Sequence, residues 1–265
     1  MRSFVVVGLL AVPVVAGADD ASPFVTMFHQ DGGTKVDIDA AYMFANSDAP
    51  TTVTKLYRGD LFAEYVDPSN GLGGYVTIPF IHSTDAMTTK DSLGGLEVGG
   101  VLVRKLDAGT IVGHAGLVLP TISSQDSSVI GLSGSVMRIP EVYATLPDAV
   151  SLRIGVSPLF HTGSVIVRLD VNVDLNVSET NETEKPGFEV DAGIGYSSGL
   201  VAIMAEITNV VIIGDYAGLT LDVGAISARF DLGKLKPYVA VSIPLDDDAR
   251  QIMSAGVTVG LSATP

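Results

Sequence analysis

The feature that most constrains the fold is a run of alternating apolar and hydrophilic side chains at residues 165–177. Every odd position is Val or Leu, and every even position from 168 onward is Arg, Asp or Asn. Because successive side chains of a β-strand point to opposite faces, this segment has one apolar and one hydrophilic face. At roughly 3.3 Å per residue it would span about 43 Å, whereas a globular strand has ~5–6 residues. Such a pattern is typical of a transmembrane β-barrel, whose apolar face meets lipid while the polar face lines the lumen.

Similar alternation recurs along the chain and predicts a barrel of about twelve strands. The strands are expected near residues 34–45, 54–66, 72–81, 94–106, 109–120, 150–160, 163–177, 187–197, 199–212, 217–230, 236–245 and 251–261. The connections between them alternate between short turns and long polar loops, as do the periplasmic and outer connections of outer-membrane barrels. The predicted fold class is therefore all-β: a single antiparallel transmembrane β-barrel over residues 34–261, with both ends of the barrel segment on the periplasmic side.

Residues 138–146 are open to two interpretations. As a strand they would raise the number of strands to thirteen, and long and short connections would no longer alternate. As part of the third outer loop, Pro140 suits the first position of a helical turn, Glu141 suits its first turn, and Pro147 would end it. We favour the loop helix and keep the extra strand as the alternative.

The first 18 residues have the organisation of a secretory signal peptide. Arg2 supplies the charged start, residues 4–15 are apolar, and residues 16–18 form a small-residue cleavage site. The apolar stretch is too short for a transmembrane helix, which needs ~20 residues. Residues 19–33 would then begin the mature chain, either in the periplasm or inserted into the lumen. We expect export to the outer membrane.

Composition excludes several functions. The chain has 15 Lys and Arg against 30 Asp and Glu, and it has no cysteine. The acidic excess would repel phosphates, so no nucleic-acid partner is expected. Disulfide and thiolate chemistry are absent, and the scattered histidines suggest neither a metal nor a cofactor. The expected partners are outer-membrane lipid, lipopolysaccharide, the barrel assembly machinery and a small-molecule solute.

The assignment of faces predicts two sets of residues. Aromatic side chains eight positions apart lie about 26 Å apart along a strand, or roughly 20 Å along the membrane normal, which suits the two aromatic girdles of a barrel. The girdle candidates are Tyr57, Tyr65, Phe188 and Tyr196. The lumen-lining candidates are Asp37, Asp39, Arg58, Asp60, Glu64, Glu97, His114, Arg153, Arg168, Asp170, Asp174, Glu189, Asp191, Glu206 and Asp222.

The lumen-lining candidates predict the charge preference of a pore. Eleven acids and three arginines give them a formal charge of −8 with histidine neutral. Such a wall raises the local concentration of cations, so we expect a lumen that prefers cations or neutral solutes. The other interpretation is that the arginines pair with neighbouring carboxylates and fill the interior; both hold together if the pore is narrow.

Short Gly-rich motifs lie at several strand ends. They are GGLEVGG at 94–100, LVLPT at 117–121, FDLGKLKPY at 230–238 and IPL at 243–245. With these motifs the chain resembles Gram-negative outer-membrane β-barrel proteins, and more specifically the transporter family linked to meta-cleavage phenol degradation. The resemblance implies passage of small hydrophobic compounds across the outer membrane. The sequence departs from many such barrels in its last residues, VGLSATP, because those barrels end in an aromatic residue that the assembly machinery reads.

The predicted function is passive passage of small solutes through a narrow acidic lumen. One alternative is a structural or surface-interaction outer-membrane barrel with a closed lumen. Another is a soluble secreted β-sandwich or lipocalin-like binding protein, whose apolar faces would point inward. No enzymatic activity is expected: residues 82–85, His-Ser-Thr-Asp, bring hydrolase residue types together, but no recognisable motif surrounds them.

Overall fold

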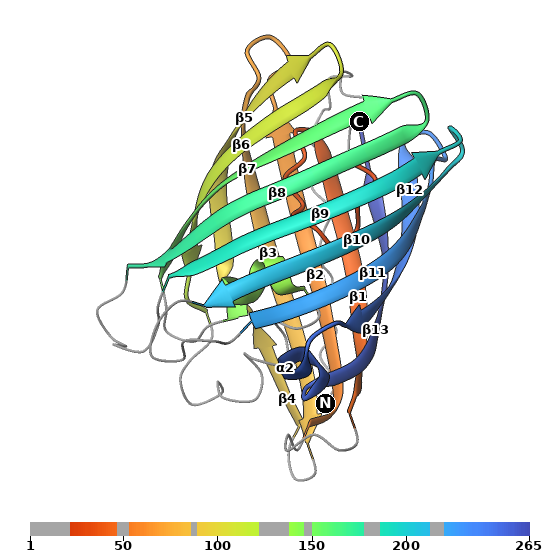
Figure 1. The fold of residues 1–265 in the computed structure, drawn as a ribbon. Helices are drawn as coiled ribbons and strands as arrows, with labels where there is room; N and C mark the ends of the chain where they lie inside the picture. Colours follow the sequence, from red (N-terminus) through yellow and green to blue (C-terminus); the bar gives the residue numbers. More distant parts are fainter. Residues whose placement is uncertain are drawn as a thin grey trace, which may run out of the picture.

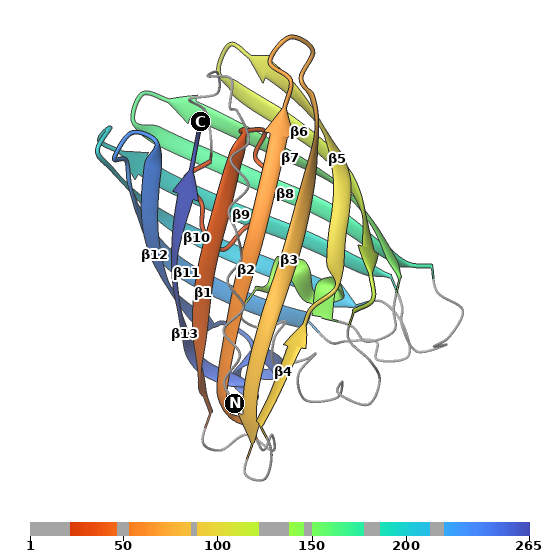
Figure 2. The same cartoon turned by 180° about the vertical axis from the view of Figure 1, so that it is seen from behind.

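The chain forms a closed, tilted barrel of long antiparallel strands (Figures 1 and 2). The computed structural model describes residues 22–46, 53–85, 89–121, 138–145, 150–177, 186–212 and 220–265. Its strands are β1 (Lys35–Ala45), β2 (Val53–Val66), β3 (Leu72–Asp85), β4 (Thr89–Leu93), β5 (Leu96–Leu106), β6 (Gly109–Leu119), β7 (Ser151–Thr162), β8 (Val165–Asn176), β9 (Gly187–Ser197), β10 (Val201–Ile212), β11 (Thr220–Phe230), β12 (Leu235–Pro244) and β13 (Met253–Ala263). The barrel closes because β1 pairs with both β2 and β13.

Strands β4 and β5 share one position in the barrel. Both pair antiparallel with β3, β5 along its first half and β4 along its second half. The break between them falls at Gly94 and Gly95. A Cβ atom on Gly95 would lie 2.7 Å from Val118 Cγ1 and 3.1 Å from the Ala144 carbonyl oxygen, so a larger residue would not fit. The barrel therefore has twelve strand positions, which confirms the predicted fold class, and the strand expected at 94–106 is preceded by β4.

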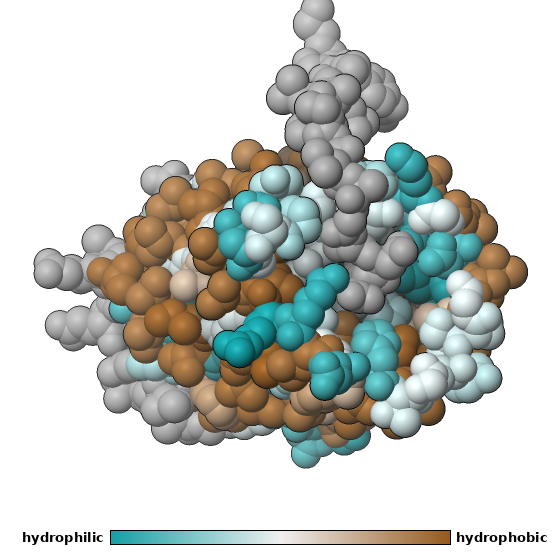
Figure 3. Space-filling view, turned by 90° about the horizontal axis from the view of Figure 1, so that it is seen from above, coloured by the Kyte–Doolittle hydropathy of each residue, from teal (hydrophilic) through white to brown (hydrophobic). Residues whose placement is uncertain are grey.

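Apolar side chains cover the outside of the barrel. Ile203, Ile207 and Ile226 are more than half exposed, at 57%, 52% and 67%. Hydrophobic residues surround the circumference in the view along the barrel (Figure 3). Soluble proteins rarely expose contiguous apolar surface on this scale. The soluble sandwich and lipocalin-like alternatives are therefore wrong, because both require the apolar faces to point inward. The girdle candidates also lie on the outer surface: Tyr57, Tyr65, Phe188 and Tyr196.

The two ends of the barrel differ. Short turns at residues 67–71, 107–108, 163–164, 198–200 and 231–234 join strands at one end, here called the turn end. The last strand ends there, and β1 begins there because Val36 lies opposite Ala263. Longer connections join the strands at the opposite, loop end, where the one-turn helix α2 (Asp247–Arg250) is capped by Asp246. No helix in the described ranges is long and apolar enough to cross a bilayer. The signal peptide predicted at 1–18 lies outside the described residues.

Candidate functional site

Two segments that are not part of the wall fill the lumen. The N-terminal insert, residues 22–34, enters from the turn end, and its residues 22–31 are all buried. The loop insert, Arg138 with the 3₁₀ helix η2 (Ile139–Thr145), lies within the barrel near the loop end (Figure 2). The helix predicted over this segment is thus present and the extra strand is not. It packs inside the lumen because Ile139, Val142 and Tyr143 join an apolar cluster with side chains of the wall.

Charged wall residues hold the N-terminal insert through its backbone. The Glu206 carboxylate of β10 accepts hydrogen bonds from the amides of Val25 and Thr26, at 3.1 and 2.6 Å, and from the Thr26 hydroxyl at 2.7 Å. Arg168 donates to the Gln30 carbonyl at 3.0 Å, and Arg229 donates to the Ser22 carbonyl. Hydrogen bonds to charged groups are stronger than those between neutral partners. The insert is therefore tied to the wall by a few polar contacts, without forming a strand.

Apolar side chains of the N-terminal insert pack in spaces that small wall residues leave. Phe24 and Met27 lie over Gly193 of β9, where a Cβ atom would come within 2.4 Å of the Phe24 ring. Phe28 lies against Arg153, whose guanidinium carbon is 4.8 Å from the ring centroid. The inward glycine at position 193 therefore leaves the space that Phe24 and Met27 occupy.

The two inserts meet at Arg138. Its guanidinium donates to Asp39 Oδ2 at 2.9 Å and to the Val25 carbonyl at 3.2 Å, and it lies 3.3 Å from His29 Nδ1. His29 Nε2 is 3.7 Å from Glu141 Oε1. Burial, helped by the charge of Arg138, lowers the pKa of His29 to about 4. Burial, reinforced by the negative charge of Asp60, raises the pKa of Glu141 to about 7. These contacts join the two inserts to one another and to the wall inside the barrel.

Arginines of the wall pair with carboxylates beside them. Arg153 contacts Asp174 at 2.9 Å and Glu97 at 2.8 Å, and Arg168 contacts Asp170 at 2.8 Å. Arg58 likewise contacts Asp60 at 2.9 Å and also pairs with Glu141 of the loop insert. Buried charges need such partners, because an unpaired charge loses its hydration without compensation. The pairing agrees with the interpretation in which the arginines fill the interior.

Fourteen of the fifteen lumen-lining candidates are buried inside the barrel. They are Asp37, Asp39, Arg58, Asp60, Glu64, Glu97, His114, Arg153, Arg168, Asp170, Asp174, Glu189, Asp191 and Glu206. Asp222 is half-buried near the loop end, where it accepts a hydrogen bond from the Asn209 side chain. Asp170 lies opposite Asp191, and Asn172 lies opposite Glu189, so β8 and β9 place acidic side chains next to one another on the wall. That these residues act on a passing solute stays a prediction.

Sequence reasoning missed three buried cations, Lys35, Arg138 and Arg229. Lys35 and Arg229 were detectable, because each continues the alternation of its strand by one more inward position. Arg138 lies outside any strand and had no such signal. With these three, the described residues contain twelve buried carboxyl groups and six buried Lys and Arg side chains. The lumen is therefore still acidic, but less so than the −8 of the predicted set.

The hydrolase-like residues of β3 do not form a catalytic group. His82 Nδ1 lies 2.5 Å from Asp91 Oδ1 of β4 at the surface, whereas Ser83 is buried on the opposite face of the strand. The positions that the structure describes also contain no cluster of three His, Asp or Glu side chains suited to a metal ion.

Comparison with known proteins identifies the fold. No family model matches the chain, and no curated protein matches its sequence. An outer membrane channel from Pseudomonas putida superposes with a TM-score of 0.63 at 10% identity, covering 94% of this chain and 99% of that one. The KdgM porin (TM-score 0.55, 14% identity) covers 87% of this chain and 99% of its own, and the NanC porin (0.57, 9%) covers 87% and 100%. The chain therefore has the fold of outer-membrane β-barrel channels, which confirms the predicted resemblance to such barrels.

Proposed function

We propose that this chain is an outer-membrane channel for passive passage of small solutes, exported by a signal peptide at 1–18 and closed in the described conformation by its two inserts. The observation that carries the proposal is an apolar-coated barrel whose charged interior encloses a segment outside the β-sheet. Its expected partners are membrane lipid, lipopolysaccharide, the assembly machinery and the solute. The excess of buried acids favours cations or neutral solutes in the open state.

The N-terminal insert can leave the lumen at less cost than a wall strand can leave the barrel. A wall strand cannot leave without breaking two ladders of backbone hydrogen bonds, and unpaired backbone groups are costly in lipid. The insert has no strand pairing, and Glu206 alone accepts three hydrogen bonds from Val25 and Thr26. Weakening that anchor should favour an open lumen.

A filled lumen also favours a second function, a structural or surface-interaction barrel that never conducts. The paired arginines and the apolar packing of η2 are what such a protein would need. The two functions differ in one measurable property, which is ionic conductance.

The test is the single-channel conductance of the refolded mature chain in planar bilayers. Glu206→Ala should open more often than the wild type, and deletion of residues 22–33 should open most. Glu189→Ala is the matched control, because Glu189 is an equally buried carboxylate of the adjacent strand that accepts no hydrogen bond from the N-terminal insert. A salt gradient should give a reversal potential of cationic sign. If the folded deletion variant does not conduct, the channel proposal fails and the structural barrel stands.

A further inference from the structure

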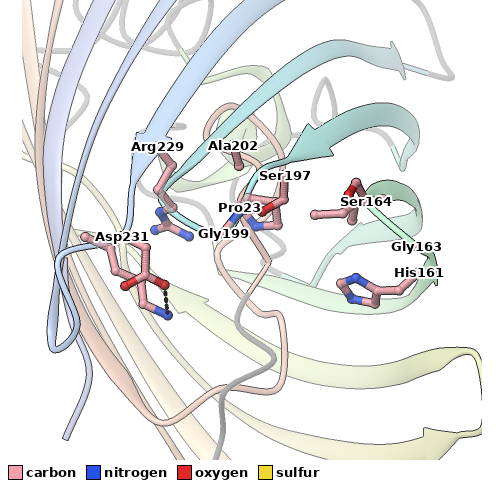
Figure 4. A pocket seen from close by; sticks show the side chains of 11 residues that line it. Pro23, His161, Gly163, Ser164, Ser197, Gly199, Ala202, Arg229 and Asp231 are labelled. Atoms are coloured by element: carbon pink, nitrogen blue, oxygen red, sulfur yellow. Dashed lines mark hydrogen bonds and ion pairs between the residues drawn. The ribbon is translucent and has the colours of Figure 1, made fainter.

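A pocket of about 250 Å³ opens at the turn end, between the N-terminal insert and the wall (Figure 4). Its apolar surface comes from Pro23 of the insert, Ile166 of β8 and Ala202 of β10, all three buried. Sites for drug-sized ligands usually have ~300–1,000 Å³, so this pocket suits a smaller molecule. The apolar surface would accommodate a short hydrocarbon chain.

The polar part of the pocket is cationic, in contrast to the acidic lumen behind it. Arg229 and Lys236 line it together with a single carboxylate, Asp231. Lys236 Nζ is 3.7 Å from Asp231 Oδ2, so Asp231 offsets one of the two cations. Figure 4 shows Arg229 and Asp231 on one side of the pocket, with Ser164 and His161 on the other. Among the described residues, no carboxylate lies within ion-pair distance of Arg229.

Arg229 differs from the other buried arginines of the described ranges, each of which contacts a carboxylate. Arg229 makes no ion pair there, and its Nε–H has no hydrogen-bond partner although the residue is only 6% exposed. The Ser22 carbonyl and the Tyr238 ring, 5.2 Å from the guanidinium carbon, hold the side chain in place. A guanidinium presents N–H donors in a fork that matches a carboxylate. A buried arginine that lines a pocket and forms no ion pair with the described residues is therefore suited to an anion.

From these observations we propose that the pocket binds a small monocarboxylate with a short apolar chain, its carboxylate at Arg229 and its chain against Pro23, Ile166 and Ala202. The acidic wall of the lumen behind the pocket would repel the anion, so the ligand would stay in the pocket at the turn end. The proposal adds a ligand class to the proposed channel. Only the role of the bound ligand in transport rests on the proposed function. Binding itself does not require the barrel to conduct, so the two proposals can fail separately.

The test is binding of hexanoate to the refolded mature protein in detergent, measured by saturation-transfer NMR. Arg229→Gln should weaken binding about tenfold, since it removes a charged hydrogen bond. Lys234→Gln is the matched control: it removes the same charge from an exposed turn residue that does not line the pocket. Heat-modifiable mobility on SDS gels would show that each variant is folded, and Lys236→Gln provides a second variant that should also weaken binding.

Hexanamide supplies the chemical control, because it keeps the chain and size of hexanoate but lacks the charge. It should not compete with hexanoate at equal concentration. The proposal is overturned if Arg229→Gln and Lys234→Gln weaken binding equally, which would indicate general charge attraction. It is also overturned if hexanamide competes as well as hexanoate, or if folded wild-type protein gives no saturation transfer to hexanoate above that of empty detergent.

Discussion

At the scale of single residues, the interior depends on ion pairs in which the loss of one partner lowers the free energy of unfolding, because the other charge is left buried and unpaired. Arg153 is fully buried and joins Asp174 of β8 to Glu97 of β5. Replacing it with Met leaves both carboxylates without their cation, which should lower the free energy of unfolding by about 3–5 kcal/mol. Urea unfolding in detergent measures this loss. Arg104→Met removes the same charge from an exposed site and should change stability by less than ~0.5 kcal/mol; equal losses in the two variants would contradict the assignment.

His29 predicts a pH dependence whose sign follows from its lowered pKa. The ring is surrounded by Asp37, Asp39, Lys35, Arg138 and Glu141. Because the pKa of His29 falls from 6.5 to about 4 on folding, the unfolded chain binds the extra proton, and stability is lost as pH falls from 6.5 to 4. The raised pKa of Glu141, about 7, acts in the opposite direction as pH rises from 4.5 to 7.

The two effects overlap, so the contribution of His29 is measured with a variant. His29→Gln removes only the histidine contribution. The unfolding free energy of the wild type minus that of His29→Gln should fall with decreasing pH, by up to about 1.4 kcal/mol per unit between pH 6 and 4.5. His161→Gln, at an exposed position near the end of β7, is the control. A difference that does not change with pH would show that His29 binds its proton equally in the folded and unfolded chains.

At the scale of elements, the strands and the loop helix were predictable, but the positions of the two inserts inside the lumen were not. Period-two alternation located all twelve strand positions, because one face of each strand meets lipid and the other meets the lumen. Residues 22–34 have no such period, so the sequence left their place open between periplasm and lumen. Their position depends on contacts with residues far along the chain, such as Glu206 and Gly193. The short break between β4 and β5 at Gly94 and Gly95 could not be predicted from the sequence either, because it lies where the loop insert approaches the wall.

The fit of η2 against the wall gives a prediction for one glycine. A Cβ atom on Gly187 would lie 2.4 Å from Tyr143 Cε2, which is closer than real contacts allow. Gly187→Ala should therefore displace η2 at a cost of about 1–3 kcal/mol while leaving the barrel closed. Hydrogen exchange of the amides of residues 141–145 should become at least about tenfold faster. Gly100→Ala, where the nearest atom is 3.7 Å away, should leave that exchange unchanged.

At the scale of the whole molecule, an outward apolar surface surrounds an inward charged one, and the bilayer is the solvent that suits this arrangement. In water the exposed isoleucines and leucines would favour association, whereas in lipid they are in their preferred surroundings. Part of the acidic excess of the sequence is lumenal, because the described residues bury twelve carboxyl groups against six Lys and Arg side chains. The cationic pocket at the turn end is the local exception.

The membrane assignment predicts how much an introduced charge lowers the free energy of unfolding at different heights along the outer surface of the barrel. Ile207 lies in the middle of β10 on the outer face, and Leu232 lies in a turn, at 52% and 63% exposure. In lipid vesicles, Ile207→Arg should lower the free energy of unfolding by about 2–4 kcal/mol, whereas Leu232→Arg should cost about 0–1 kcal/mol. The two sites are similarly exposed, so only the depth of surrounding hydrocarbon separates them. Equal costs in vesicles would mean that the apolar surface does not lie in the bilayer.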